Sequence, residues 1–144
     1  MTAGHAPLFQ EGLRGEPFWL LVACSLVNRA TWKVAGPIHD RIRSDWPNPT
    51  SLAAAGTGLE AVLAPLGFGS RRGVLLRRLA AAWAARPARN SRDVLGLPGC
   101  GRYASDSFSV FVEGRRPERE PSDHYLRVYL ERGVVSAPRG ALFT

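Results

Sequence analysis

The stretch LPGCGRYASDS, residues 97–107, decides the fold of this 144-residue chain. It sets two glycines, Gly99 and Gly101, between two segments with helical patterns. Glycine permits a tight turn with positive φ, because it has no Cβ that would clash. The backbone N–H groups of the turn and of the next helix then point outward together and form a concavity for an anion, beside the charge of Arg102. The alternative is an ordinary turn between two helices with a glycine cap.

Basic residues are concentrated before and within this stretch. Lysine and arginine number 19 against 12 acidic residues, and Lys33 is the only lysine. Between Phe68 and Arg102 eight arginines stand against one acid, Asp93, a surplus of seven that equals the net charge of +7 of the whole chain. A basic surface concentrated in this way indicates a polyanionic partner. The preference for arginine can also reflect genome composition alone.

The two cysteines, Cys24 and Cys100, exclude several kinds of site. Two isolated thiols cannot build a disulfide framework, a four-cysteine zinc site or an iron–sulfur cluster, so we expect no metal centre. No secretory signal opens the sequence, which predicts an intracellular protein, in the cytoplasm or nucleoid of a bacterium or the nucleus of a eukaryote. The longest apolar run, residues 18–27, is shorter than the ~20 residues that cross a bilayer, so no membrane partner is expected.

Helical patterns cover most of the chain. The run SFSVFV alternates and could be a strand, but it has no partner strand, so we assign it to a helix. Caps, breakers and apolar spacing predict an all-α domain of about eight helices. These helices cover residues 17–30, 31–45, 51–55, 57–67, 70–86, 91–96, 103–112 and 122–131.

The hairpin and a later aspartate together point to a family. Leu-Pro-Gly-Cys-Gly before a helix is a helix-hairpin-helix pattern, and Asp123 stands 20 positions after Tyr103 in the stretch EPSDHYLRVYL. A hairpin followed by such an aspartate resembles the helix-hairpin-helix DNA glycosylases, the superfamily that includes endonuclease III. The chain is most similar to the thymine glycosylase domain that is attached to methyl-CpG-binding domains. Four stretches carry this likeness, residues 9–38, 63–73, 97–111 and 120–130.

The resemblance implies how the chemistry would be done. An N-glycosidic bond breaks through a sugar with oxocarbenium character, which a fixed carboxylate stabilises while it orients or deprotonates a water. Asp123 is the candidate, although an acid beside the cap Ser122 could simply complement a helix dipole. Members that also cut the strand carry a lysine where this chain has Tyr103. Because a phenol cannot form a Schiff base, we expect a DNA N-glycosylase without lyase activity. Tyr103 would line the base pocket, or else be a half-buried core residue.

The target base must leave the duplex before it can react. The resemblance implies that Arg29 fills the vacated space and that Phe68 is a wedge between bases of the opposite strand, where this branch tends to have an aliphatic residue. Gln10 matches a glutamine whose amide reads the edge of the flipped pyrimidine. Phe9 and Tyr125 join it in the base pocket, and Tyr125 replaces a lysine. Arg29 could instead be a surface arginine that faces solvent.

The fold implied by the resemblance is bilobal within a single catalytic domain, residues 1–144. One lobe, residues 37–113, carries the hairpin at 97–101, and the other combines residues 1–36 with 114–144. DNA would lie across the cleft, with a phosphate held by Gly99, Gly101 and Arg102 without sequence reading. We expect no cofactor, although the hairpin carbonyls could hold a structural K⁺ or Na⁺ ion.

We therefore predict a monomeric, monofunctional glycosylase that acts on double-stranded DNA with a mismatched or damaged base. It would flip out and excise thymine or uracil opposite guanine in base excision repair. An adenine mismatch glycosylase is an alternative, weakened by the missing cluster and the missing C-terminal recognition domain. A non-catalytic helix-hairpin-helix DNA-binding module, which would not need Asp123, is another. A third is an all-α interaction protein whose basic face binds some other acidic partner.

Overall fold

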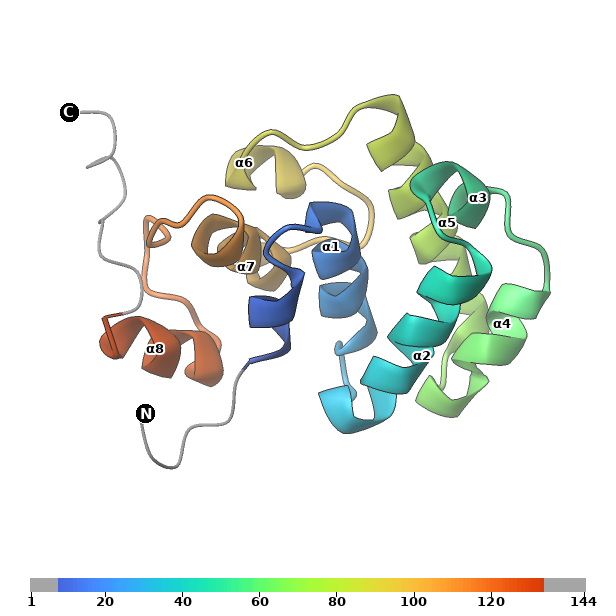
Figure 1. Cartoon of the computed structure of the whole chain (residues 1–144), viewed down its shortest axis with the longest axis horizontal. Coiled ribbons are helices and arrows are strands. Elements are labelled where there is room, and N and C mark those ends of the chain that lie inside the picture. The colour runs from blue at the N-terminus through green and yellow to red at the C-terminus, as the bar shows by residue number, and fades with distance from the viewer. Residues whose placement is uncertain (1–7, 134–144) are drawn as a thin grey trace.

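The computed structural model describes residues 8–133, and within them the chain is helical without strands. Residues 8–133 form eight α-helices and two short 3₁₀ helices, so the predicted all-α fold of about eight helices is confirmed. Figure 1 shows how the helices are arranged. In chain order the elements are η1 (Phe9–Leu13), α1 (Pro17–Leu26), α2 (Trp32–Asp45), α3 (Pro49–Ala53), α4 (Gly58–Leu63), η2 (Ala64–Leu66), α5 (Gly69–Ala85), α6 (Ser91–Val94), α7 (Arg102–Phe111) and α8 (His124–Glu131).

Helix α1 lies at the centre of the molecule, between α2 and α5 on one side and η1 and α7 on the other (Figure 1). Its sequence PFWLLVACSL is apolar around the whole helix, and eight of its ten residues are buried. A helix that is apolar on every side must be covered on every side. Each large aliphatic side chain buried in this way contributes roughly 1.5–3 kcal/mol, so α1 is the main apolar support of the fold.

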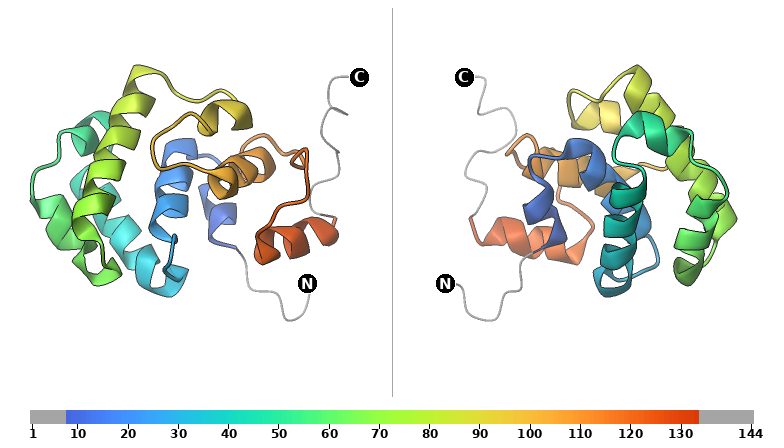
Figure 2. Two further views of the ribbon diagram at one scale, coloured as in Figure 1. Left: turned by 180° about the vertical axis from the view of Figure 1, so that it is seen from behind. Right: turned by 45° about the vertical axis from the view of Figure 1, so that its right-hand side comes forward.

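On one side of α1, the long helix α5 lies beside α3 and α4, as Figure 2 shows from behind. One ion pair fixes this contact. Arg77 on α5 donates two hydrogen bonds of 2.6 Å to the Glu60 carboxylate and two of 2.7 Å to the carbonyls of Ala55 and Gly56. These bonds hold the pKa of Glu60 below its usual value. Thr57, the N-cap residue of α4, makes no side-chain capping bond, and the Glu60 carboxylate is bound by Arg77.

On the other side of α1, α6 and the hairpin lead into α7, which packs on both α1 and η1. The predicted lobe boundaries at residues 36/37 and 113/114 stay a prediction. Helix α7, assigned to the middle lobe, packs against α1 and η1 of the terminal lobe because its apolar residues Phe108, Val110 and Phe111 are all buried. The parts of the terminal lobe at residues 1–7 and 134–144 lie outside the described residues.

Most predicted helix boundaries differ from the observed ones by one to four residues. The N-cap of α8 is Asp123, not Ser122, and α5 begins at Gly69, one residue before the predicted start. Helix α1 ends at Leu26, four residues before the predicted end. Serine and aspartate cap helices about equally well, so the incoming loop decides which of them does so. The last carbonyls of α1, those of Ser25 and Leu26, accept hydrogen bonds from Arg72, and this tertiary contact accounts for the early end of the helix.

One buried histidine generates a prediction about pH and stability. His39 lies between the rings of Trp19 and Trp32, and its Nε2 is 2.9 Å from the Trp19 carbonyl oxygen. Burial lowers its pKa below the ordinary 6.5, against the smaller raising effects of the Trp19 carbonyl and Asp40; Arg43 lowers it further. Below pH 6.5 the unfolded chain takes up a proton here before the folded chain does, so acid favours unfolding.

We therefore expect the free energy of unfolding to hold steady above about pH 6.5 and to fall as the pH drops toward 5. Urea titrations at several pH values measure this slope. The slope should be smaller in His39→Gln, whereas His124→Gln, at an exposed position, serves as the matched control. An unchanged slope in His39→Gln would contradict the assignment.

Candidate active site

One cleft of about 1300 Å³ brings together elements that are far apart in the sequence. It is bounded by η1, the loop after α1, the start of α5, the hairpin, the start of α7 and the start of α8. Every residue that the sequence singled out for the site lines this cleft: Phe9, Gln10, Arg29, Phe68, Gly99, Gly101, Arg102, Tyr103, Asp123 and Tyr125. The chemical roles given to them stay predictions at this point.

The hairpin has the predicted tight turn, but only one of its glycines needs positive φ. Gly99 has φ +74°, and the turn is closed by a 3.1 Å hydrogen bond from the Cys100 N–H to the Leu97 carbonyl. Gly101 has an extended backbone, φ −118°, and precedes α7 as its N-cap. The expectation of a left-handed turn at both glycines is therefore wrong for Gly101. A side chain there would meet open space, so its backbone is accessible from the cleft.

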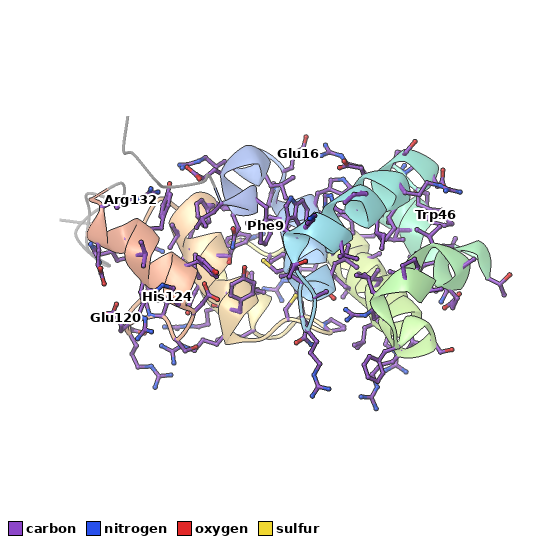
Figure 3. The ribbon with its side chains drawn as sticks, turned by 90° about the horizontal axis from the view of Figure 1, so that it is seen from below. Phe9, Glu16, Trp46, Glu120, His124 and Arg132 are labelled. Carbon is purple, nitrogen blue, oxygen red and sulfur yellow. The ribbon has the colours of Figure 1, made fainter. Side chains whose placement is uncertain are left out.

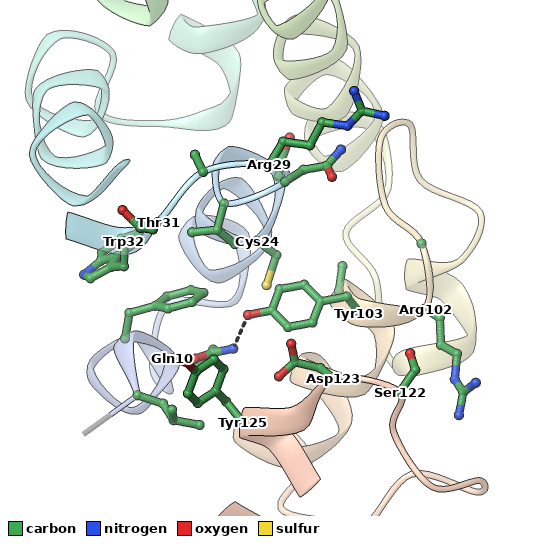
Figure 4. A pocket seen from close by; sticks show the side chains of 18 of the residues that line it. Gln10, Cys24, Arg29, Thr31, Trp32, Arg102, Tyr103, Ser122, Asp123 and Tyr125 are labelled. Atoms are coloured by element: carbon green, nitrogen blue, oxygen red, sulfur yellow. Dashed lines mark hydrogen bonds between the residues drawn. The ribbon is translucent and has the colours of Figure 1, made fainter. Parts of the chain in front are cut away.

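Arg102 begins α7 but its side chain is engaged within the protein. Its guanidinium donates to the Glu120 carbonyl and lies 3.6 Å from a carboxylate oxygen of Asp106. Figure 4 shows the Arg102 side chain extending past Ser122. Arg102 thus connects the hairpin with the segment that leads to Asp123, and contact with a phosphate stays a prediction.

A buried polar cluster forms the floor of the cleft. The Gln10 amide nitrogen donates 2.8 Å to the Tyr103 hydroxyl and 3.4 Å to Ser107 Oγ, and Gln10 is only 2 % exposed (Figure 4). Within the described residues no donor reaches its Oε1. A buried amide oxygen without a donor is costly, so this atom is suited to receive a hydrogen bond from a ligand.

Burial also sets the protonation state of this cluster. Desolvation, with a smaller contribution from Cys24 and Asp123, raises the pKa of the Tyr103 phenol well above its usual value. Burial raises the pKa of the Cys24 thiol to about 12. Both groups are therefore neutral at physiological pH, and neither is an activated nucleophile.

Asp123 sits at the mouth of the cleft, half-buried, as the N-cap of α8. Its Oδ2 accepts a 3.0 Å hydrogen bond from the Leu126 N–H. In the described part of the chain no hydrogen bond engages Oδ1. Figure 4 shows the carboxylate directed toward Gln10 and Tyr103. The alternative interpretation, an acid that stabilises a helix N-terminus, is therefore correct as structure and compatible with a second role, because one oxygen is left to the cleft.

Two aromatic side chains flank the cluster. The Phe9 ring stacks on the Trp32 ring, with centroids 4.5 Å apart, and Figure 3 shows Phe9 near the middle of the molecule. Tyr125 is 67 % exposed and lies beside His124 on the first turn of α8. Tyr125 and Gln10 line the same cleft.

Arg29 and Phe68 stand on two loops at the rim of the cleft. Both have left-handed backbone, φ +64° and φ +53°, and among the described non-glycine residues no others have positive φ. Such backbone costs roughly 1–3 kcal/mol for each residue and is concentrated at functional sites. Phe68 is 62 % exposed, an unusual position for a large apolar side chain unless it meets a partner.

Sequence reasoning missed four residues of the site. Cys24, Ser107 and Trp32 line or support the base of the cleft, and Arg72 holds its rim. From the sequence, Cys24 is considered only for a disulfide, a zinc site or an iron–sulfur cluster. No local signal distinguishes Arg72 from the neighbouring arginines of α5, since three of its four carbonyl partners lie more than 40 residues away.

The hairpin before α7, the carboxylate at the start of α8 and the cleft between them define the helix-hairpin-helix DNA glycosylase fold. Comparison with solved structures supports this class. A thermostable thymine-DNA glycosylase superposes with a TM-score of 0.70 at 19 % identity, over 78 % of this chain and 54 % of that one. Endonuclease III, in a non-covalent complex with DNA, superposes with a TM-score of 0.61 at 22 % identity, over 66 % and 47 %.

Sequence comparison points in the same direction, although no family model matches the chain. The chain is 28 % identical over 123 residues to a methyl-CpG-binding domain protein 4-like protein of Arabidopsis thaliana. It is 32 % identical over 134 residues to a thymine/uracil-DNA glycosylase of Pyrobaculum aerophilum. The matches take in 85 % and 87 % of this chain, but only 27 % and 56 % of the length of those proteins. The predicted resemblance to the helix-hairpin-helix DNA glycosylases is thereby confirmed.

Two further predictions concern metals and membranes. Among residues 8–133, no group of three or more histidine, cysteine, aspartate or glutamate side chains could hold a metal ion. No helix in that range is long and apolar enough to cross a bilayer.

Asp123 both caps α8 and lines the cleft, and its capping role gives a prediction about stability. Asparagine caps helices as well as aspartate, whereas alanine does not. We expect Asp123→Asn to leave the melting temperature nearly unchanged and Asp123→Ala to cost about 1 kcal/mol. Thermal melts followed by circular dichroism test this. No loss in Asp123→Ala would show that the cap does not stabilise α8.

Proposed function

We propose that this protein is a DNA glycosylase of base excision repair that flips out thymine or uracil opposite guanine and hydrolyses its N-glycosidic bond. One observation carries the proposal: the Asp123 carboxylate lines the same cleft as Gln10, whose buried amide oxygen receives no hydrogen bond from the described residues. The likeness to a thymine/uracil-DNA glycosylase and to a methyl-CpG-binding domain protein 4-like protein supports it.

The pocket chemistry suits a flipped pyrimidine. Thymine and uracil carry an N3–H that can donate to Gln10 Oε1, whereas N3 of cytosine has no hydrogen. Phe9 and Tyr125 offer aromatic faces beside this position. The pocket therefore has the polar group and the apolar walls that a nucleobase deaminase or glycosylase uses to hold an extruded base.

Asp123 is in a suitable place for hydrolysis. As the C1′–N1 bond breaks, its electron pair leaves with the base and the sugar gains positive charge. A carboxylate fixed by the Leu126 N–H would stabilise that charge and take the proton of the water that adds to C1′. Strand cleavage by Schiff-base chemistry needs an amine at the sugar, and position 103 offers a neutral phenol. The only lysine, Lys33, is not among the residues that line the cleft, which supports a monofunctional enzyme.

The rim of the cleft suits a duplex. Arg29 and Phe68 project from its edge, the first to fill the vacated space and the second to part the opposite strand. The turn at Gly99 and the backbone before α7 would hold a phosphate. We propose that the enzyme acts as a monomer inside the cell, in the cytoplasm, nucleoid or nucleus, without an obligatory cofactor; a K⁺ or Na⁺ ion at the hairpin would be structural.

Base release should depend on the mismatch and on Asp123. Duplexes with G·T, G·U or G·A pairs, or with no mismatch, are incubated with protein and then treated with alkali. We expect breaks for G·T and G·U, and only after alkali. Asp123→Asn should lower the single-turnover rate at least about 100-fold while duplex affinity stays the same. Breaks before alkali would refute the monofunctional reaction, and unchanged release in Asp123→Asn would refute the catalytic role.

Gln10 should matter only while a base is in the pocket. Gln10→Leu has nearly the same volume but no amide, so we expect excision of uracil from G·U to fall about tenfold or more. Binding to a duplex with a tetrahydrofuran abasic analogue, which lacks a base, should be unaffected. Equal loss of both, measured on protein with an unchanged melting temperature, would show that Gln10 acts on the fold and not on the base.

A further inference from the structure

Arg72 is an arginine that the chemistry described above does not use. It lies on the first turn of α5 and is only 9 % exposed. Its guanidinium makes four contacts with backbone carbonyls: 2.9 Å to Gly67, 2.8 Å to Asn28, and 3.4 Å to both Ser25 and Leu26. One side chain thus connects the loop after α1 with the loop before α5.

The two strongest of these bonds fall at particular peptide groups. Asn28 precedes Arg29 and Gly67 precedes Phe68, so Arg72 holds the carbonyl next to each of the two left-handed residues. Fixing a carbonyl fixes its peptide plane, and the plane sets φ of the following residue. The backbone N–H of Arg72 also donates 2.9 Å to the Phe68 carbonyl, so the peptide groups on both sides of Phe68 are held.

The charge of Arg72 is balanced by dipoles and not by an acid. Among the described residues no carboxylate lies within ion-pair distance of it, and its partners Ser25 and Leu26 present the last carbonyls of α1, the negative end of that helix. Burial lowers its pKa from the usual value. Burying a charge that only carbonyl dipoles balance costs free energy of folding. The rest of the structure must supply the stability that offsets this cost.

We propose that Arg72 is the positioning residue for base flipping: its planar guanidinium locks the Arg29 loop and the Phe68 loop to each other, so that both side chains enter the duplex as one preset unit. The proposal rests on the function proposed above. Without the hydrogen bonds of Arg72, each loop could relax from its left-handed backbone conformation. Each flipping event would then have to supply the free energy that restores this conformation. The fork geometry is essential, because lysine is a point donor that cannot serve two loops in one plane.

Base flipping can be measured separately from chemistry. In an Asp123→Asn background, 2-aminopurine placed beside the uracil of a G·U duplex becomes fluorescent when the neighbouring base leaves the stack. We expect Arg72→Lys to lower the equilibrium constant for flipping about tenfold, the effect of losing one charged hydrogen bond. Affinity for a fully paired duplex should not change. Arg72→Gln, which keeps an amide donor without the buried charge, is the second variant if Arg72→Lys melts below the assay temperature.

Arg77→Lys is the matched control. Arg77 lies on the same helix, is also partly buried and also donates to two carbonyls, but it connects α5 to the segment before α4 and does not line the cleft. Its substitution should lower the melting temperature without changing the 2-aminopurine signal. If Arg77→Lys reduces flipping as much as Arg72→Lys does, the effect is one of general stability and the proposal is wrong.

A double-mutant cycle tests whether Arg72 acts through the two rim residues. In an Arg29→Ala, Phe68→Ala background, adding Arg72→Lys should cause no further loss of excision, because the side chains to be positioned are gone. A further tenfold loss there would overturn the proposal. Hydrogen exchange in the unmutated protein gives a further check. The Arg72 Nε–H should exchange slowly with solvent. Exchange as fast as that of the exposed Arg29 would overturn the proposal.

The two proposals fail differently. If the unmutated protein releases neither thymine nor uracil from any duplex, the proposed function is wrong. If it releases uracil from G·U and Arg72→Lys flips the base as well as the unmutated protein does, only the role of Arg72 is wrong.

Discussion

Helix α1 is buried on all sides, and this burial constrains everything around it. A helix so deep in the protein cannot leave its terminal backbone groups to water, so side chains from elsewhere must reach them. At the C-terminal end of α1 the carbonyls of Ser25 and Leu26 accept hydrogen bonds from Arg72. The loop that follows is thereby held at Arg29, and the helix face with Cys24 becomes a wall of the cleft. The apolar core and the proposed site are built on the same helix.

Asp123 likewise combines a structural role with a proposed role in the reaction. The residue that caps α8 is also the one proposed to act on the sugar, and the capping bond to Leu126 fixes one oxygen while the other faces the cleft. Rigid placement of a charge is what electrostatic stabilisation of a transition state requires. Stability and chemistry are thus coupled at one side chain, and they can be separated because asparagine keeps the cap and loses the charge.

The floor and the rim of the cleft differ in character. The floor, around Gln10 and Tyr103, is buried, neutral and connected by hydrogen bonds, which suits the reading of a base withdrawn from water. The rim, at Arg29 and Phe68, is exposed and conformationally strained, which suits insertion into a stacked duplex. Arg72 lies beneath the rim, and we propose that it keeps the strain from relaxing.

The sequence by itself determined the all-α fold, the tight turn at Gly99, and the set of ten residues that meet in one cleft. The first two features depend on local patterns in the chain. Most of the ten site residues came from the resemblance to the helix-hairpin-helix DNA glycosylases, which the 20 positions between Tyr103 and Asp123 support. Only the tertiary structure decided that Gly101 is extended, that Asp123 and not Ser122 caps α8, and that Gln10 has an oxygen without a donor. It alone singled out Arg72 among the arginines of α5. Each of these facts depends on which groups from distant segments arrive at the same point, and a buried hydrogen bond across 40 or more residues leaves no periodic trace in a sequence.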